Sequence, residues 1–157
     1  MLYTHQKEEN KMTAVIIYAS KHHGNTKKVC DRIASECNVT LVEASEVSDR
    51  FPWEDYDLVG FASGIAFKKF YEPVNNAAAM IPAGKKAFFI YTCAANDQDF
   101  SAHIRGIVES RGAECIGTYG CKGYNTFGPL KLIGGMNKKN PTEEELASAV
   151  DFYRSIE

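Results

Sequence analysis

The chain has 157 residues, of which 45% are hydrophobic and 24% charged, a composition typical of one globular domain. Eighteen basic against twenty acidic side chains leave a formal net charge of −2, which argues against a general nucleic-acid binder. No run of about 18 apolar residues occurs, so we expect no membrane span. Residues 1–12 are polar and predict an N-terminal tail, followed by a single domain over residues 13–157.

The cysteines are odd in number and form no C-x-x-C pair, which favours reduced thiols over a disulfide framework or a zinc site. They are Cys30, Cys37, Cys93, Cys115 and Cys121. With no apolar signal-peptide core at the N-terminus, the sequence predicts a cytoplasmic protein without a metal centre.

Five apolar runs predict strands, and they lie at residues 13–19, 39–42, 56–62, 87–91 and 115–119. Several of these runs are continuous rather than alternating, which is typical of a parallel sheet that is covered on both faces.

Helical spacing separates these runs along the chain. Apolar residues recur over 29–37 and again over 100–108, where Asn96 is a candidate N-cap and Gly112 a candidate stop. Both segments therefore predict amphipathic helices that pack against the sheet.

Two further helices are indicated by their termini. Pro73 suits the first turn of a short helix that ends before Pro82. Thr142 followed by Glu145 predicts a capping box at the start of the last helix.

This alternation predicts a three-layer α/β/α fold, with a doubly wound, five-stranded parallel sheet in the order 2-1-3-4-5. Ligands of such sheets bind beyond the carboxyl ends of the strands, at the switch point between strands 1 and 3. The segments predicted to surround a ligand are therefore the loops at residues 20–25, 63–70, 92–96 and 121–128.

The loop after the first strand has the chemistry of a phosphate site. Ser20 and Thr26 offer hydroxyls, Asn25 offers an amide, and Gly24 allows close approach of the backbone at a helix N-terminus. A capped helix start that binds nothing is the alternative. The dinucleotide G-x-G-x-x-G and NTPase G-x-x-x-x-G-K-[ST] patterns are absent.

Two histidines in this loop, His22 and His23, invite a metal interpretation, but no third ligand accompanies them. A phosphate contact from one of them is the favoured prediction.

Residues 15–28, VIIYASKHHGNTKK, resemble the phosphate loop of the flavodoxin family, which binds FMN and carries electrons. The usual loop is [ST]-x-[ST]-G-x-[ST]. This chain keeps Ser20, Gly24, Asn25 and Thr26, but it has one extra residue and His22-His23 where a hydroxyl is usual. The resemblance extends from residue 12 to 157 and implies a short-chain, flavodoxin-like protein.

The resemblance also implies which residues surround the flavin ring. From the loop after the third strand these are Ile65, Ala66, Phe67 and Lys68. From the loop after the fourth they are Thr92, Cys93 and Asn96, with Cys93 interpreted as a packing residue that offers its backbone N–H.

Lysines are the unusual feature of these loops, because acidic flavodoxins surround the flavin with carboxylates. Lys68 and Lys69 suggest a less negative reduction potential, or else are two solvated surface lysines. In the last loop, Tyr124 and Phe127 are candidates for contact with the ring or with a partner. A local basic patch there comprises Lys122, Lys131, Lys138 and Lys139.

The predicted function is a low-potential, one-electron carrier that binds FMN and serves redox partner proteins as a monomer or weak dimer. One alternative is an FMN-dependent NAD(P)H:quinone-type oxidoreductase, although the sequence offers no evident general acid or base. Another is a fold that has lost its cofactor. A receiver module is excluded because Ala62-Ser63-Gly64 stands where an acidic phosphoacceptor is needed.

Overall fold

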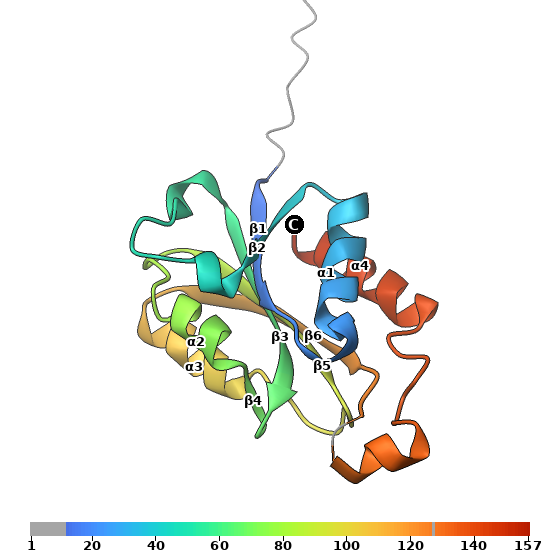
Figure 1. Ribbon diagram of the computed structural model, residues 1–157. Coiled ribbons are helices and arrows are strands. Elements are labelled where there is room, and N and C mark those ends of the chain that lie inside the picture. The colour runs from blue at the N-terminus through green and yellow to red at the C-terminus, as the bar shows by residue number, and fades with distance from the viewer. Residues whose placement is uncertain (1–11, 127) are drawn as a thin grey trace, which may run out of the picture.

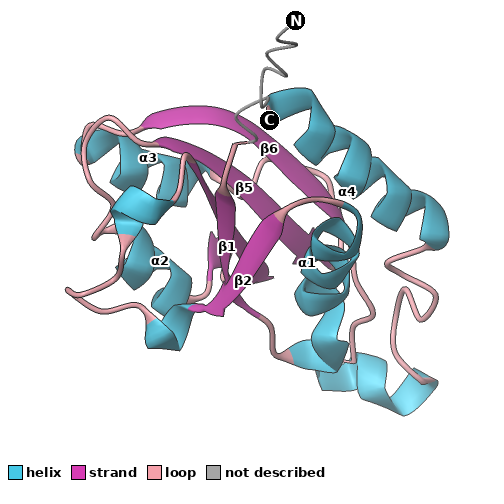
Figure 2. Cartoon of the chain, turned by 90° about the horizontal axis from the view of Figure 1, so that it is seen from above, coloured by secondary structure: helices cyan, strands magenta, loops and turns pink. Residues whose placement is uncertain are grey.

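A computed structural model describes residues 12–126 and 128–157, and it shows a twisted sheet between two layers of helices (Figure 1). The strands of the main sheet are β1 (Ala14–Ala19), β2 (Val39–Glu43), β3 (Leu58–Ala66), β5 (Lys86–Cys93) and β6 (Glu114–Lys122). The helices are α1 (Asn25–Glu36), α2 (Glu72–Ala78), α3 (Ala102–Ser110) and α4 (Glu143–Ile156). Helices α1 and α4 cover one face of the sheet, and α2 and α3 cover the other (Figure 2).

The strands of the main sheet are parallel and lie in the order β2-β1-β3-β5-β6, which confirms the predicted order 2-1-3-4-5.

Nearly all of the predicted tail, residues 1–11, lies outside the described residues. None of the helices that the structure describes has the length and apolar character needed to cross a bilayer.

One predicted loop, at residues 63–70, is wrong. Strand β3 continues to Ala66 because Ser63 and Gly64 still pair with β5, opposite Tyr91 and Thr92. A short strand β4 (Lys69–Phe70) then turns back antiparallel to β3. The small, polar Ser-Gly pair ends the apolar run in the sequence but does not end the backbone ladder.

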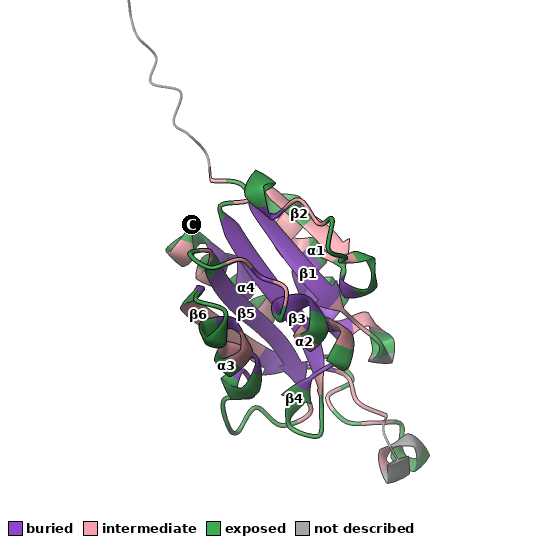
Figure 3. Ribbon diagram, turned by 90° about the vertical axis from the view of Figure 1, so that its left-hand side faces the viewer, coloured by how far each residue is buried: buried purple, intermediate pink, exposed green. Residues whose placement is uncertain are grey.

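Side chains alternate between two cores, one on each face of the sheet, and the strands at the centre are buried (Figure 3). Toward α2 and α3 the sheet presents Val15, Ile17, Val59, Phe61, Phe89 and Tyr91. Toward α1 and α4 it presents Ala14, Ile16, Leu58, Ala62, Phe88 and Ile90. Burial on both faces explains the continuous apolar runs in the sequence.

Helix α3 begins at Ala102, so Asn96 is not its N-cap as predicted. The carboxylate of Asp99 instead accepts hydrogen bonds from the backbone N–H and hydroxyl of Ser101. The Asn96 amide donates to the carbonyl of Gly120 at 2.9 Å. The Asn96 side chain is therefore engaged in a tertiary contact with β6 and not in capping α3. The stop at Gly112, which has φ of 82°, and the position of Pro73 in the first turn of α2 are confirmed.

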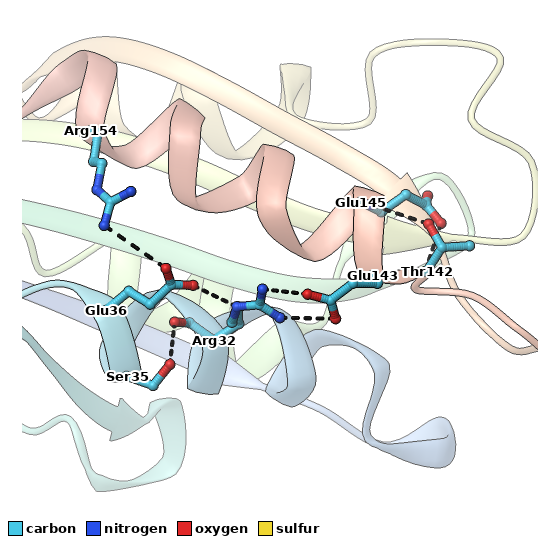
Figure 4. Close-up of polar contacts among 7 residues, drawn as sticks. All are labelled: Arg32, Ser35, Glu36, Thr142, Glu143, Glu145 and Arg154. Carbon is cyan, nitrogen blue, oxygen red and sulfur yellow. Dashed lines mark hydrogen bonds and ion pairs between the residues drawn. The ribbon is translucent and has the colours of Figure 1, made fainter.

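Helices α1 and α4 are joined by a network of ion pairs (Figure 4). The Arg32 guanidinium binds both oxygens of Glu143, with Nη1 at 3.1 Å from Oε2, and its Nε donates to Glu36. Glu36 also lies 3.9 Å from the guanidinium of Arg154. The Arg32 guanidinium lowers the pKa of Glu143 through these hydrogen bonds.

The predicted capping box of α4 is confirmed, with the Thr142 hydroxyl accepting from the Glu145 N–H and the Glu145 carboxylate accepting from the Thr142 N–H. Burial on its own raises the pKa of Glu145. Hydrogen bonds from Thr142, from Asn140 and from the Lys122 backbone outweigh burial, so the pKa lies below its ordinary value.

Gly60 makes room for the ring of Phe88 on the neighbouring strand. A Cβ at residue 60 would lie 2.4 Å from Cζ of Phe88. We expect Gly60→Ala to destabilise the fold by about 1–3 kcal/mol, because the core has to move to relieve the overlap. Urea unfolding measures this.

The matched control is Gly106→Ala in α3, where an added Cβ meets nothing within 4 Å. This variant should gain about 0.5–1 kcal/mol from helix propensity. Equal effects of the two substitutions would contradict the packing described at Gly60.

The ionised Glu145 stabilises the folded chain above its unfolded pKa, and this stabilisation is lost as the pH falls through the lower folded-state pKa. Glu145→Gln keeps the capping geometry but removes the charge. We therefore expect the wild type to exceed the variant in unfolding free energy at pH 7, and the difference to shrink below about pH 4. Glu144→Gln, at an exposed neighbour, controls for the loss of one carboxylate. If the difference in unfolding free energy between the wild type and Glu145→Gln did not change with pH, the ionised carboxylate would not be the stabilising group.

Candidate functional site

A cavity of about 320 Å³ lies at the carboxyl ends of β1, β3, β5 and β6, where the predicted ligand loops converge. The first loop and α1 contribute Ser20, Lys21, Asn25 and Thr26. The β3–β4 hairpin and its return contribute Gly64, Ile65, Ala66, Phe67 and Tyr71. The remaining lining residues are Thr92, Cys93, Ala94, Gly123, Tyr124 and Asn125.

The N-terminus of α1 forms one end of this cavity. A turn at residues 22–24 leads into the helix, and its residues His23 and Gly24 have φ of 55° and 64°. Gly24 supplies no side-chain cap, and the first turn of α1 holds no acid. The backbone N–H groups of that turn and the positive end of the helix dipole therefore favour an anion here.

Two hydroxyls reinforce this end of the cavity. The Ser20 Oγ accepts from the Lys27 N–H at 3.2 Å and keeps its own proton for another acceptor. The Thr26 and Thr92 hydroxyls lie 2.9 Å apart in a buried hydrogen bond, so the first and third loops are tied together. Only one of these two protons is used by that bond, which leaves the other for a ligand.

Asn25 joins the first loop to the last. Its Nδ2 donates to the carbonyl of Tyr124 at 2.8 Å. Its Oδ1 is buried and has no hydrogen-bond partner among the described residues. The amide fits only because residue 123 is glycine, since a Cβ there would lie 2.5 Å from Nδ2. The structure thus holds a buried acceptor next to a cavity.

The hairpin after β3 makes the opposite wall. Phe67 and Lys68 at its tip have φ of 51° and 65°, a left-handed conformation that side chains disfavour. The Ser63 hydroxyl, which accepts from the Tyr71 N–H at 2.8 Å, ties the base of the hairpin together. The Phe67 side chain is 96% exposed. The tip therefore carries backbone strain without gaining burial.

Tyr71 and Lys21 close one side of the cavity, and neither was predicted from the sequence as a residue that contacts the cofactor. The Lys21 ammonium lies 4.8 Å from the centre of the Tyr71 ring, a cation–π contact between the first and second loops. The Tyr71 hydroxyl lies against Gly64, where a Cβ would be 2.4 Å away. Burial raises the pKa of Tyr71. Gly64, near the carboxyl end of β3, was the only feature of the sequence that could have indicated the close approach of Tyr71.

Cys93 has the environment of a packing residue. Its Sγ donates to the carbonyl of Cys121 at 3.5 Å, and burial raises the pKa of the Cys93 thiol to about 12. The thiol is therefore protonated at neutral pH and is a poor nucleophile.

The structure brings together many of the residues named from the sequence. Those that line the cavity are Ser20, Asn25, Thr26, Ile65, Ala66, Phe67, Thr92 and Cys93. Tyr124, the other ring candidate, lines it too, whereas Phe127 and the side chain of His22 lie outside the described residues.

Four predicted site residues do not line the cavity, namely His23, Gly24, Lys68 and Asn96. The His23 ring lies 4.0 Å from the Tyr124 ring, and its Nε2 is 2.9 Å from the Thr126 hydroxyl. These contacts attach the last loop to the first. The described residues contain no group of three His, Cys, Asp or Glu side chains that could hold a metal ion.

Comparison with known proteins gives a family. The sequence profile of the flavodoxin domain matches residues 15–109. An uncharacterised protein of Methanocaldococcus jannaschii is 38% identical over 148 residues, which cover 92% of this chain and 98% of that protein.

Solved structures share the fold. Flavodoxin 1 of Bacillus cereus has a TM-score of 0.66 at 18% identity, over 92% of this chain and 96% of that one. A Lactobacillus acidophilus flavoprotein solved in complex with FMN has a TM-score of 0.56 at 17% identity, over 70% of this chain and 93% of that one.

The hairpin tip offers a direct test of its conformation. Lys68→Gly removes the cost of a side chain at φ of 65°, and we expect the unfolding free energy to rise by about 0.5–1 kcal/mol. Lys69→Gly, one residue further along in β4, should lower it by a similar amount because glycine weakens a strand. Thermal and urea unfolding of both variants measure these changes. A change in unfolding free energy of the same sign in both variants would contradict the positive φ at Lys68.

Proposed function

Since the chain belongs to the flavodoxin domain family, we propose that its cavity binds FMN and that the protein carries single electrons between redox proteins. The observation that carries the proposal is the combination, in one cavity, of a helix N-terminus whose N-cap residue, Gly24, has no capping side chain and a partly apolar hairpin wall. FMN has a terminal phosphate at one end and an aromatic ring system at the other, and this cavity has matching chemistry at its two ends.

The α1 end would hold the phosphate. The backbone N–H groups of the first turn and the hydroxyls of Ser20 and Thr26 are hydrogen-bond donors, and no carboxylate lines the cavity among the described residues. The buried Oδ1 of Asn25 is an acceptor that would suit a ribityl hydroxyl. The donor set therefore fits the cofactor although the loop has histidines where a hydroxyl is usual.

The hairpin end would hold the ring. Ile65, Ala66 and Phe67 provide apolar surface, and Tyr71 and Tyr124 add aromatic surface nearby. The Thr92 hydroxyl and the backbone of Cys93 and Ala94 provide polar groups for the pyrimidine edge of a flavin. Both ends of the cofactor therefore find suitable partners.

Bound FMN supplies a ring that accepts and donates electrons one at a time. The chain's own part is to hold the ring beside exposed backbone and side chains at the tip of the hairpin. Neither a histidine nor a carboxylate lines the cavity in the described part of the chain, and the Cys93 thiol is protonated. These features favour a carrier over an enzyme that moves protons on a bound substrate.

An FMN titration followed by absorbance and flavin fluorescence tests this proposal. We expect binding by the wild type, and about 10- to 100-fold weaker binding by Thr26→Val, because a hydrogen bond to a charged phosphate is lost. Thr40→Val, at an exposed threonine of β2, should bind FMN like the wild type.

Absence of FMN binding by the folded wild-type protein would refute the proposal. Rapid reduction of the bound flavin by NADH or NADPH alone would favour the nicotinamide-dependent enzyme instead of the carrier.

A further inference from the structure

We propose that the surface around the mouth of this cavity docks an electron-transfer protein whose own docking face is acidic. The inference rests on the proposed function and adds to it the chemistry of the partner. We call this surface the basic rim and define it by six exposed lysines: Lys21, Lys68, Lys69, Lys122, Lys138 and Lys139.

The charge of the rim is opposite in sign to that of the whole chain, whose formal net charge is −2. None of the six lysines makes an ion pair within the described residues. The acids at the same end of the molecule are largely engaged: Asp99 with Arg105, Glu143 with Arg32, and Glu145 in the cap of α4. Glu72, Asp97 and Glu144 make no ion pair in the part of the chain that the structure describes, and Glu145 keeps its charge in the cap, so four carboxylates stand against the six lysines. The exposed Glu43 and Glu46 lie at the end of the edge strand β2 and just after it, and they are not counted with this group.

The rim also carries apolar side chains that face solvent. Phe67 is 96% exposed at the hairpin tip, and Leu132 and Ile133 are 89% and 76% exposed. Leu132 and Ile133 belong to the segment of residues 128–133, which projects from the body of the fold on the same side as β4 (Figure 1). Apolar residues surrounded by charge are typical of a protein-binding surface rather than of a solvated face.

Hydrogen bonds attach the residues that follow this projecting segment to the loops that line the cavity. The Tyr124 hydroxyl donates to the carbonyl of Gly134 at 3.1 Å, and Asn125 pairs with Met136 through backbone bonds. The Asn137 amide donates to the carbonyl of Ala94 at 2.7 Å, which places Lys138 next to the third loop. The hairpin therefore lines the cavity on one side, and residues 134–137 are attached to its lining on another.

The strained hairpin is a second indication. Two-residue hairpin turns with positive φ are normally built from Asn-Gly or Asp-Gly, yet this one has Phe67 and Lys68. Residues kept in a conformation that costs folding energy, with side chains that pack against nothing in the chain, are expected where those side chains serve binding.

An acidic redox protein fits this surface better than a second copy of the chain. Two basic rims repel each other when they meet face to face, whereas an acidic face is attracted and steered. The partner must also approach the cavity mouth to exchange electrons, and the rim surrounds that mouth. Charge complementarity and position therefore favour the same occupant.

The test uses the FMN-loaded protein and a reduced, acidic plant-type [2Fe–2S] ferredoxin as the probe, mixed by stopped flow at increasing ionic strength. We expect the second-order rate constant for flavin reduction to fall at least tenfold from low to high salt. The variant Lys68→Glu/Lys138→Glu should lose at least about tenfold at low salt. The control Arg50→Glu/Lys86→Glu makes the same change in net charge in the loop before β3 and at the start of β5 and should stay within about threefold of the wild type.

The two proposals fail in different ways. If the protein does not bind FMN, the proposed function fails. Calorimetric titration of the flavin-free protein with oxidised ferredoxin then still tests the rim, through the same variant and control. A rate constant that is independent of salt, or equal for the variant and the control, would overturn the docking proposal and leave the FMN proposal standing.

Other occupants give distinct results. Loss in the variant of binding to vesicles of anionic phospholipid, with ferredoxin transfer unaffected, would overturn the proposal in favour of a membrane surface. Loss in the variant of a dimer seen by sedimentation velocity, with transfer unaffected, would overturn it in favour of a second copy. Midpoint potentials of all variants are measured, so that a change in driving force is not mistaken for a change in docking.

Discussion

The geometry of the site depends on one constraint, that a parallel sheet has to be covered on both of its faces. Each crossover returns over one face, so β1, β3, β5 and β6 all end at the same edge. The segments that follow β1 and β3 lead to opposite faces of the sheet, to α1 on one face and α2 on the other, and this opens a crevice at that edge. The four segments that line the cavity are far apart in sequence. They meet at this edge because each of them follows a strand of the same parallel sheet.

The cavity combines two kinds of local structure. At the α1 end, the turn holds positive φ angles at His23 and Gly24, and the N–H groups that Gly24 leaves uncapped are ordinary for a helix terminus. At the hairpin end, Phe67 and Lys68 hold positive φ angles that favour glycine. Ladder pairing of Ile65 with Phe70, and the bond from Tyr71 to Ser63, hold this turn in place. The sheet thus holds the strained, exposed tip of the β3–β4 hairpin beside a helix N-terminus that can bind an anion.

Long-range hydrogen bonds complete the site where the local pattern is weak. Apolar residues of the last loop such as Leu132 and Ile133 are exposed and do not anchor it in the core. The loop is attached instead through hydrogen bonds that involve Asn25, His23 and Asn137. These contacts explain why His23, which was expected to meet a phosphate, packs on Tyr124 instead. They also place exposed lysines of that loop around the mouth of the cavity, although the chain as a whole is slightly acidic.

Local and periodic signals in the sequence determined the strand order, the helix termini at Gly112, Pro73 and Thr142, and the position of residues 20–26 at a helix N-terminus. Such features depend on side chains that are close in sequence or on the pattern of burial, and the sequence displays both directly. Only the tertiary structure decided that β3 continues through Ser63 and turns back at β4. It alone placed Lys21 over Tyr71 and detached Asn96 from α3. These outcomes depend on neighbouring strands and loops that lie tens of residues away, and local propensity does not encode them.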